Sequence, residues 1–336
     1  MADAVFPPPD IDPLEQFRFS YEEIELLGPL LHLPEVFYGP NRYQVSRFKG
    51  LCLVLYRMAW PQRLSDAKTL FGMSKSSIST MFHFVLREIY VRWKHLLLFD
   101  HVRLTPAFLS QCAQPVVERG GLVPNTFAFI DGTHMRICRP MNDQEEFYSG
   151  QKHFHSIKYQ AITTPDGIII HVGGPFSGRR HDARLADDSR IRSYLSEHAR
   201  SPTGVQMVVY GDEGYGQSDE IKAPFRGNIL TAEQNLRNES MRRPRLCAEW
   251  SFGFMSNNFG LINYYQKLRV GLSPIGLYFP VAALFCNLLR CFGRGSTTLS
   301  YYQMAAPTPQ EYLTPLEVWQ ATRVVHVEPA YFEQNI

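Results

Sequence analysis

The sequence predicts a mixed α/β sheet with covering helices, preceded by an all-α N-terminal region. In the first third of the chain, apolar residues recur at helical spacing. The segment Arg119-Gly120-Gly121, followed by Pro124, breaks that pattern. Beyond it, short strand-like runs and helical segments follow one another. We therefore expect a helical region over 1–118, a sheet-containing domain over 119–300 and a C-terminal tail over 301–336.

The composition is that of a folded chain rather than a disordered or strongly basic one. Of its 336 residues, 45% are hydrophobic and 20% are charged, and the net charge is only +2. A uniformly basic nucleic-acid binder is excluded, although local basic faces are not. The six cysteines form no closely paired motif, so we expect reduced thiols in an intracellular protein.

Residues 48–90 fit a helix-turn-helix. We expect a short helix from Ser65 to Phe71 with Ser65 as its N-cap, a stop at Gly72 and a longer helix after Ser74. The longer helix carries a continuous apolar stripe: Ile78, Met81, Phe82, Val85, Leu86 and Ile89. Its exposed start could contact DNA phosphates and base edges through Lys75, Ser76 and Ser77. An ordinary helical hairpin is the alternative.

The second part changes to strand periodicity. Strands are expected at 127–130, 156–163, 168–172 and 205–210, with a turn at Thr164-Pro165-Asp166-Gly167 and helices over 182–199 and 245–254. The apolar stretch 276–292 is interrupted by Pro280, Asn287 and Arg290 and is shorter than a membrane span of roughly 20 residues. It predicts a buried core helix and no membrane association.

Two carboxylates stand where predicted strands end. Asp131 closes the run Phe127–Ile130, and Asp212 follows the run that ends at Tyr210. A carboxylate beside a buried strand is costly unless it binds a cation or is hydrogen-bonded. Each aspartate alone could simply cap a turn. Two of them on neighbouring strands favour a metal site.

Two further acids belong to predicted helices. Glu249 lies beside a core stripe, and its ordinary alternative is a salt bridge to Arg245 one turn earlier. Asp182 opens the helix 182–199, where a first-turn acid is also favoured by the helix dipole. Oxygen ligands without paired cysteines favour Mg²⁺ or Mn²⁺, and two such ions can promote phosphodiester displacement.

Five blocks in order make the chain resemble the PIF/Harbinger superfamily of transposases. They are Ile130-Asp131-Gly132-Thr133-His134, His155–Gln160, Gly178-Arg179-Arg180-His181-Asp182, Gly211-Asp212-Glu213-Gly214-Tyr215 and Glu249–Gly253. The resemblance implies an RNase H-like fold. It also implies a catalytic DDE triad of Asp131, Asp212 and Glu249, with Asp182 as a fourth metal position. His134 and His181 are expected to support these ligands through hydrogen bonds.

The implied reaction is metal-dependent cutting of DNA at transposon ends, followed by joining of the 3′-hydroxyl to target DNA. Basic residues next to the acids are expected to contact DNA: Arg179, Arg180, Arg242, Arg243 and Arg245. Because acids are interspersed with them, an internally paired surface is the alternative.

The resemblance also suggests a Myb-like DNA-binding partner protein, a homo-oligomer on DNA and nuclear function with partner-assisted import. The alternative function is that of a domesticated Harbinger-derived protein, acting as a nuclease or as a non-catalytic DNA-binding or chromatin scaffold. A general phosphodiesterase of small substrates is a third reading, which would leave the N-terminal helices without a purpose.

Overall fold

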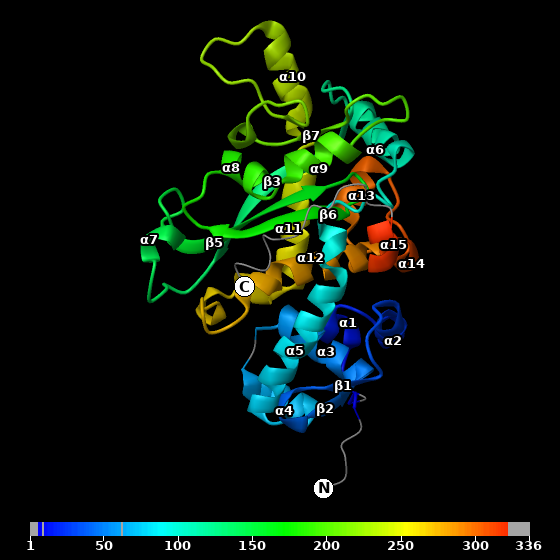
Figure 1. Ribbon diagram of the computed structural model, residues 1–336, viewed down its shortest axis with the longest axis vertical. Helices are drawn as coiled ribbons and strands as arrows, with labels where there is room; N and C mark the ends of the chain where they lie inside the picture. Colours follow the sequence, from blue (N-terminus) through cyan, green and yellow to red (C-terminus); the bar gives the residue numbers. More distant parts are fainter. Residues whose placement is uncertain (1–5, 9, 62, 322–336) are drawn as a thin grey trace.

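The computed structural model describes residues 6–8, 10–61 and 63–321. In Figure 1 the N-terminal helices occupy the lower end of the molecule, the sheet lies above them and α10 stands at the top. Short 3₁₀ helices connect the main elements: η1 Pro40–Arg42, η2 Lys94–Leu97, η3 Glu213–Tyr215, η4 Gly260–Asn263, η5 Tyr265–Lys267 and η6 Ile275–Leu277.

The N-terminal region is mainly helical, but it is not all-α as the sequence predicted. Its helices are α1 Pro13–Phe17, α2 Tyr21–Leu30, α3 Arg47–Ala59, α4 Leu64–Phe71 and α5 Lys75–Trp93. Between α2 and α3, the strands β1 Val36–Tyr38 and β2 Gln44–Ser46 pair antiparallel. Phe37 packs against Gly50 of α3, where a Cβ would meet its ring at 2.8 Å. Three-residue strands are too short to leave a periodic signal.

The predicted short helix, turn and long helix are present as α4, Gly72 and α5. Gly72 ends α4 with φ 63°, and the Ser74 side chain accepts a hydrogen bond from the Ser77 N–H at the start of α5. Every residue of the predicted apolar stripe is buried. The predicted N-cap Ser65 is wrong, because α4 begins at Leu64 and Arg63 is its N-cap.

A mixed sheet forms the centre of the second part, as predicted. Its strands are β3 Thr126–Arg136, β4 Tyr148–Ser149, β5 Phe154–Thr163, β6 Ile169–Ser177, β7 Val208–Tyr210 and β8 Ile221–Lys222. The order is β6-β5-β3-β7-β8, and β4 pairs with the first residues of β5. β6, β5 and β3 are antiparallel neighbours, whereas β7 and β8 run parallel to β3.

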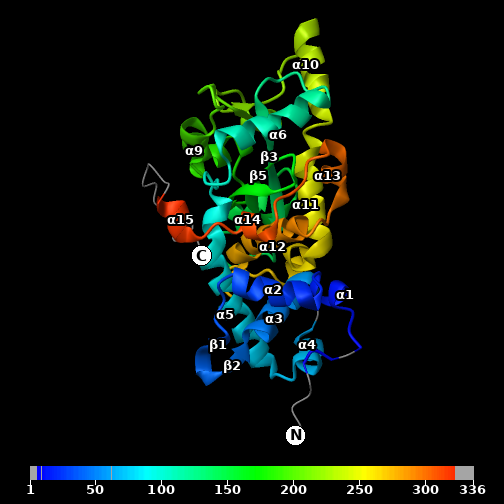
Figure 2. The same cartoon turned by 90° about the vertical axis from the view of Figure 1, so that its right-hand side faces the viewer.

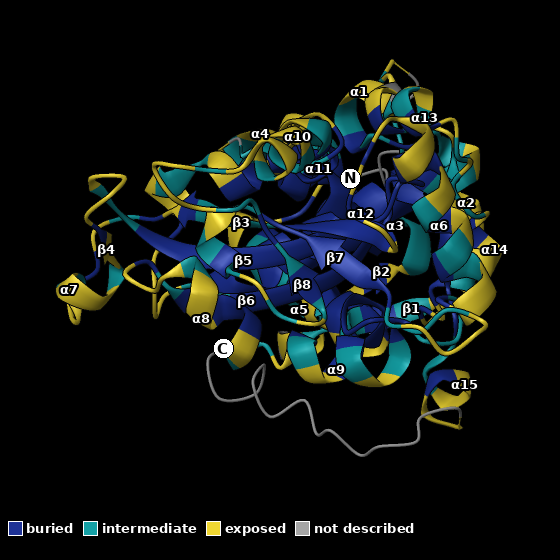
Figure 3. Cartoon of the chain, turned by 90° about the horizontal axis from the view of Figure 1, so that it is seen from above, coloured by how far each residue is buried: buried dark blue, intermediate teal, exposed yellow. Residues whose placement is uncertain are grey.

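Helices cover both faces of this sheet, as Figures 2 and 3 show, with α11 on one side and α9 on the other. The helices of this part are α6 Pro106–Glu118, α7 Gln144–Phe147, α8 Asp182–Asp188, α9 Ile191–His198, α10 Ala232–Arg242, α11 Leu246–Asn258 and α12 Tyr278–Cys291. The single helix predicted over 182–199 is two helices, because Arg190 between them has φ 56° and breaks the hydrogen-bond ladder.

The predicted core helix is α12, and nearly all of its residues are buried. Its Asn287 side chain accepts a hydrogen bond from the Ile169 N–H and donates one to the Ile169 carbonyl, both at 2.8 Å. These two bonds fix α12 against the first residue of β6. In the part of the chain that the structure describes, no helix is long and apolar enough to cross a membrane.

Two of the expected boundaries do not coincide with packing units. α6 packs on β3, so it belongs with the sheet although it precedes residue 119. The described part of the expected tail is not peripheral: α13 Ser296–Tyr302, α14 Pro309–Tyr312 and α15 Leu316–Ala321 bury Tyr302, Tyr312 and Trp319. Large aromatic side chains supply this burial. Residues 322–336 of the expected tail lie outside the described residues.

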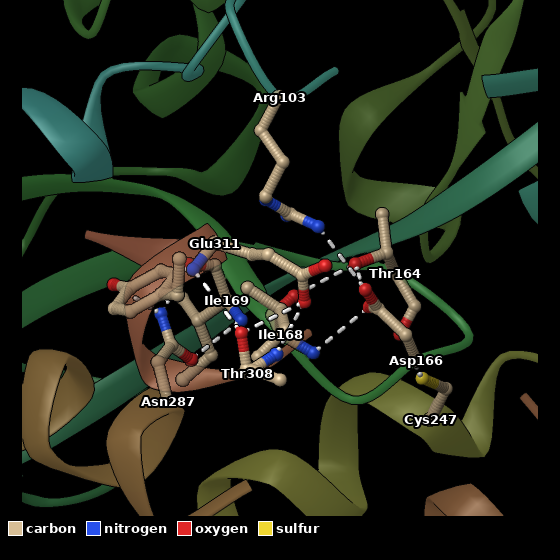
Figure 4. Close-up of polar contacts among 10 residues, drawn as sticks. Arg103, Thr164, Asp166, Ile168, Ile169, Cys247, Asn287, Thr308 and Glu311 are labelled. Carbon is tan, nitrogen blue, oxygen red and sulfur yellow. Dashed lines mark hydrogen bonds and ion pairs between the residues drawn. The ribbon is translucent and has the colours of Figure 1, made fainter. Parts of the chain in front are cut away.

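The β5–β6 turn is held by a buried ion pair, shown in Figure 4. Asp166 is fully buried, and its Oδ2 accepts a hydrogen bond from Nη1 of Arg103 at 3.2 Å. Its other oxygen accepts hydrogen bonds from the Thr164 hydroxyl at 2.5 Å and the Ile168 N–H at 3.1 Å. All of these partners compensate the desolvation of the carboxylate.

Candidate active site

The register of the sheet brings Asp131 and Asp212 together. Phe129 of β3 pairs with Tyr210 of the parallel strand β7, and each aspartate follows two residues later. Neighbouring strands lie about 4.8 Å apart, so the two backbones carry their carboxylates side by side. Asp131 does not close its strand as predicted, since β3 continues to Arg136 in partnership with β5. The neighbouring strand β7 ends at Tyr210, so β3 has no β7 partner beyond Phe129.

Both aspartates lie in an environment that disfavours their charged form. Burial, reinforced by the charges of Asp212 and Glu249, raises the pKa of Asp131 to about 6. Burial and then the charge of Asp182 raise the pKa of Asp212. The two carboxylates accept hydrogen bonds from the N–H groups of Gly132 at 3.0 Å and Gly214 at 2.9 Å. The four predicted acids thus form one electrostatic cluster.

Glu249 reaches this cluster from α11 on one face of the sheet. Its carboxylate is partly exposed and lies 2.9 Å from Nη2 of Arg245, one turn earlier. The salt bridge weighed as the ordinary alternative is therefore present. The charge of the same Arg245 partly offsets the rise in the pKa values of Asp131 and Asp212. This one cation therefore acts on all three acids.

Asp182 lies on the opposite side of β3. A Cβ on Gly132 would meet Asp182 Oδ1 at 3.0 Å, whereas the side chain of Asp131, the preceding residue, points to the other face of the sheet. Asp182 Oδ1 lies 2.5 Å from Nζ of Lys158 in β5. Sequence reasoning assigned no role to Lys158, although a lysine inside the buried run 156–163 is an unusual residue that could have drawn attention to it.

A groove of about 1170 Å³ opens beside Asp182 and Asp212, while Asp131 and Glu249 are not among its lining residues. Both predicted supporting histidines line it. His134 Nδ1 lies 2.8 Å from the Ser156 hydroxyl, and burial followed by the charge of Lys158 lowers its pKa to about 4. His181 is exposed at the N-cap of α8. The groove therefore has both carboxylates and basic side chains on its walls.

Glycine is required at the loop that carries the basic rim of this groove. A Cβ on Gly178 would overlap the carbonyl oxygen of Phe147 and come within 2.5 Å of the carbonyl oxygen of Ser156. Backbone oxygens cannot move aside as a flexible side chain can. The loop Gly178–Asp182 can therefore approach β5 this closely only with glycine at its first position.

The residues predicted to contact DNA do not form one surface. Arg180 is paired with Asp188 at 2.8 Å, Arg242 lies 3.9 Å from Glu239, and Arg243 lies over the Tyr301 ring. Arg179 is exposed on the groove. Lys75, Ser76 and Ser77 begin α5 next to α4, which Figure 1 places at the far end of the molecule from β3. The paired-surface alternative thus holds for several arginines.

The donor chemistry of the cluster fits a divalent cation. Asp131, Asp212, Glu249 and Asp182 supply only carboxylate oxygens, which suit Mg²⁺ and Mn²⁺. Like charges contribute to the raised pKa of Asp131, so an added cation would stabilise its ionised form. Among the residues that the structure describes, no three His, Cys, Asp or Glu side chains are already arranged to hold a metal ion. Glu249 already pairs with Arg245 through Oε1, so a metal ion at Glu249 would lie near this cation.

Part of the chain that contains the four acids is similar in sequence to known proteins. Residues 130–287 match the family described as DDE superfamily endonuclease. A curated protein described as a probable transposase for insertion sequence element IS702, from Microchaete diplosiphon, is 30% identical over 128 residues. That match covers 36% of this chain and 42% of the relative, so it spans less than half of that relative's length. No solved structure matches. Residues 130–287 are thus similar to DDE superfamily endonuclease domains.

Proposed function

We propose that this protein is a DDE transposase of the Harbinger type, which cuts DNA at transposon ends and joins the 3′-hydroxyl to target DNA. The observation that carries the proposal is the meeting of Asp131, Asp212 and Glu249 from two strands and a helix in one electrostatic cluster. The strand order β6-β5-β3-β7-β8 supports the RNase H-like arrangement that such enzymes use. Catalysis by such a site is mostly positioning and charge neutralisation.

The proposed roles follow from where each side chain lies. Asp131, Asp212 and Glu249 would hold Mg²⁺ or Mn²⁺, and Glu249 would share or exchange its contact with Arg245 to do so. Two such ions, when bound, supply activation of the attacking oxygen and neutralisation of the leaving oxygen. The N–H groups of Gly132 and Gly214 fix the orientation of the two aspartates. Arg179 on the groove is placed to bind a DNA phosphate.

Cleavage of a plasmid that carries the ends of the element tests this proposal. Wild-type protein should nick at those ends in Mg²⁺ or Mn²⁺, and Asp131→Asn should lower the rate by more than about 100-fold, because ligand losses exceed those of supporting residues. Asp219→Asn, which changes an exposed acid of a nearby loop, should leave cleavage unchanged. Equal cleavage by Asp131→Asn and wild type would refute the assignment.

DNA binding by the helix-turn-helix is a separate part of the proposal. Lys75 and Ser76 are exposed at the start of α5, where the helix N-terminus also favours phosphate. Lys75→Ala should weaken DNA binding and reduce the slope of log affinity against log salt by about 1. Lys267→Ala, at an exposed lysine of η5, should leave the slope unchanged.

The proposed setting is a homo-oligomer on DNA in the nucleus, with a Myb-like partner that assists import and end recognition. Size-exclusion chromatography with light scattering, run with and without end DNA, tests the oligomer. Reporter localisation with and without the partner tests assisted import; nuclear entry of the chain alone would contradict that step.

A domesticated, non-catalytic DNA-binding or chromatin scaffold is the second candidate. The observation that favours it is that Arg245 and Lys158 already pair with Glu249 and Asp182, so half of the acids are neutralised by protein cations. Under this alternative, Mn²⁺ should neither bind nor raise the unfolding temperature, whereas DNA binding should persist. A domesticated nuclease would instead cut DNA without joining ends.

A further inference from the structure

The candidate site has two sides, separated by β3. On one face of β3, Asp131 lies towards α11, which carries Glu249 and has Arg245 as its N-cap. On the other face, Gly132 pairs with Gln160 and His134 with Lys158, so these side chains share the face that looks towards Asp182. Asp212 at the end of β7 interacts with acids of both sides. The carboxylate on the α11 side, Glu249, pairs with Arg245, whereas the carboxylate on the α8 side, Asp182, pairs with Lys158.

On the side of β3 that faces α8, the ammonium group of Lys158 already pairs with the carboxylate of Asp182. Lys158 is only 5% exposed at its side chain, and its ammonium donates to Asp182 Oδ1 at 2.5 Å and to the Arg180 carbonyl at 2.9 Å. A buried ammonium is unfavourable unless it is paired and hydrogen-bonded. If Asp182 turned its Oδ1 to a metal ion, Lys158 would be left buried beside a second positive charge.

Asp182, whose side chain is 30% exposed on the groove, is also flanked by backbone on two sides. A Cβ on Gly132 would meet its Oδ1 at 3.0 Å, and a Cβ on Gly214 would meet its Cβ at 3.1 Å. Gly214 is the residue whose N–H orients Asp212. The side chain of Asp182 is thus wedged between β3 and the turn that presents Asp212, so its position sets the distance between them.

A buried tyrosine lies on the same side. Tyr215 is 2% exposed, and its hydroxyl has no hydrogen-bond partner among the described residues. A Cβ on Gly132 would lie 3.5 Å from that hydroxyl. Burial, and then the charges of Asp182, Asp131 and Asp212, hold the pKa of Tyr215 well above its usual value, so it stays protonated. Asp182 therefore has a cation and a neutral hydroxyl beside it in addition to the Asp212 carboxylate.

We propose that Asp182 is a positioning residue held by Lys158. Asp182 sets the position of the turn that presents Asp212 and of the loop Arg179–His181. The metal ligands are then Asp131, Asp212 and Glu249. This inference rests on the proposed function for the three-ligand set. It departs from the four-carboxylate set that the family resemblance implies. Lys158 in this role is a fixed internal counter-charge that holds the Asp182 carboxylate away from the metal ligands.

Mn²⁺ binding to the purified full-length chain, measured by calorimetry without DNA, tests the ligand set. Asp182→Asn should keep the stoichiometry of wild type and change the affinity less than threefold. Asp212→Asn should weaken Mn²⁺ binding by more than tenfold. Asp188→Asn, the acid of α8 that pairs with Arg180, is the matched control and should match wild type. Equal losses in Asp182→Asn and Asp212→Asn would overturn the proposal.

Unfolding in urea tests the Lys158 part independently of metal. Lys158→Met and Asp182→Asn should each lower the midpoint, and the double variant should lose clearly less than the two losses added, because both charges leave together. Additive losses would show that the pair is not coupled and would overturn the role of Lys158. If wild type binds no Mn²⁺ but the coupling is present, the proposed function and its ligand set fail while the Lys158–Asp182 clamp stands.

Discussion

Arg245, the N-cap of α11, and Glu249 of that helix form a 2.9 Å ion pair, and both charges act on Asp131. One residue was predicted to contact DNA and the other to bind metal, yet in the structure they bind each other. In the proposed site, Arg245 would therefore compete with a metal ion for the same carboxylate. Because Glu249 is partly exposed, the pair is weak enough to open, as exposed pairs contribute only about 0.2–1 kcal/mol.

Removal of this competitor should strengthen metal binding. We expect Arg245→Gln to tighten Mn²⁺ binding by up to about fivefold, which corresponds to an exposed ion pair. Calorimetric titration with Mn²⁺ measures the change, and Arg242→Gln, which alters an exposed arginine of α10, should have no effect. Weaker Mn²⁺ binding in Arg245→Gln would show that Arg245 supports the site rather than competing for it.

Gly178 should tolerate no side chain. In Gly178→Ala, the new Cβ would overlap the carbonyl oxygens of Phe147 and Ser156, so the loop to Asp182 must shift. We expect a loss of about 1–3 kcal/mol in the free energy of unfolding, together with reduced DNA cleavage. Urea denaturation gives the first quantity. Gly150→Ala, on the same groove with no atom within 4 Å of the added Cβ, should be neutral, and equal behaviour of the two variants would contradict the packing argument.

The buried ion pair below the β5–β6 turn should dominate the stability of that hairpin. Asp166→Ala leaves Arg103 largely buried without its counter-charge and removes the acceptor of the Ile168 N–H. We expect a loss of about 3–5 kcal/mol in the free energy of unfolding. Chemical denaturation followed by circular dichroism measures it, with Asp219→Ala at an exposed position as the control. A loss below 1 kcal/mol would mean that the pair is not needed.

Stability should fall in mild acid because buried histidines, His171 and His83 among them, are held in neutral form. Burial lowers the pKa of His171 to about 3, and burial with the charge of Arg57 lowers that of His83 to about 4. In the unfolded chain both titrate near 6.5, so below that pH the unfolded state takes up protons first. The stabilisation is complete above pH 6.5 and is lost progressively as the pH falls towards these values.

The pH dependence can be assigned by substitution. His171 should account for about 1 kcal/mol of the loss between pH 7 and pH 5.5. His171→Leu should flatten the plot of unfolding free energy against pH by that amount, whereas His153→Gln, at an exposed histidine, should leave the plot unchanged. An unaltered slope in His171→Leu would show that this ring does not titrate on unfolding.

Much of the fold could be predicted from local signals. The α5 stripe, the Gly72 stop and the hairpin around Thr164–Gly167 were predicted correctly, because periodicity and turn chemistry act over a few residues. Short or context-dependent features were missed. The three-residue strands β1 and β2 leave no period, and the break at Arg190 depends on a single backbone conformation. The aromatic burial of α13–α15 depends on surfaces far away in the chain.

The chemical groups of this protein follow from its amino-acid order: carboxylates next to strand ends, an apolar core helix, and motif blocks that resemble one enzyme superfamily. Which of the charges meet depends on the folded arrangement. The pairing of Lys158 with Asp182 depends on the loop that crosses back over β5, and the neighbourhood of Asp131 and Asp212 depends on the register of β3 with β7. Electrostatic interactions act through space, so their partners are fixed by folding rather than by order along the chain.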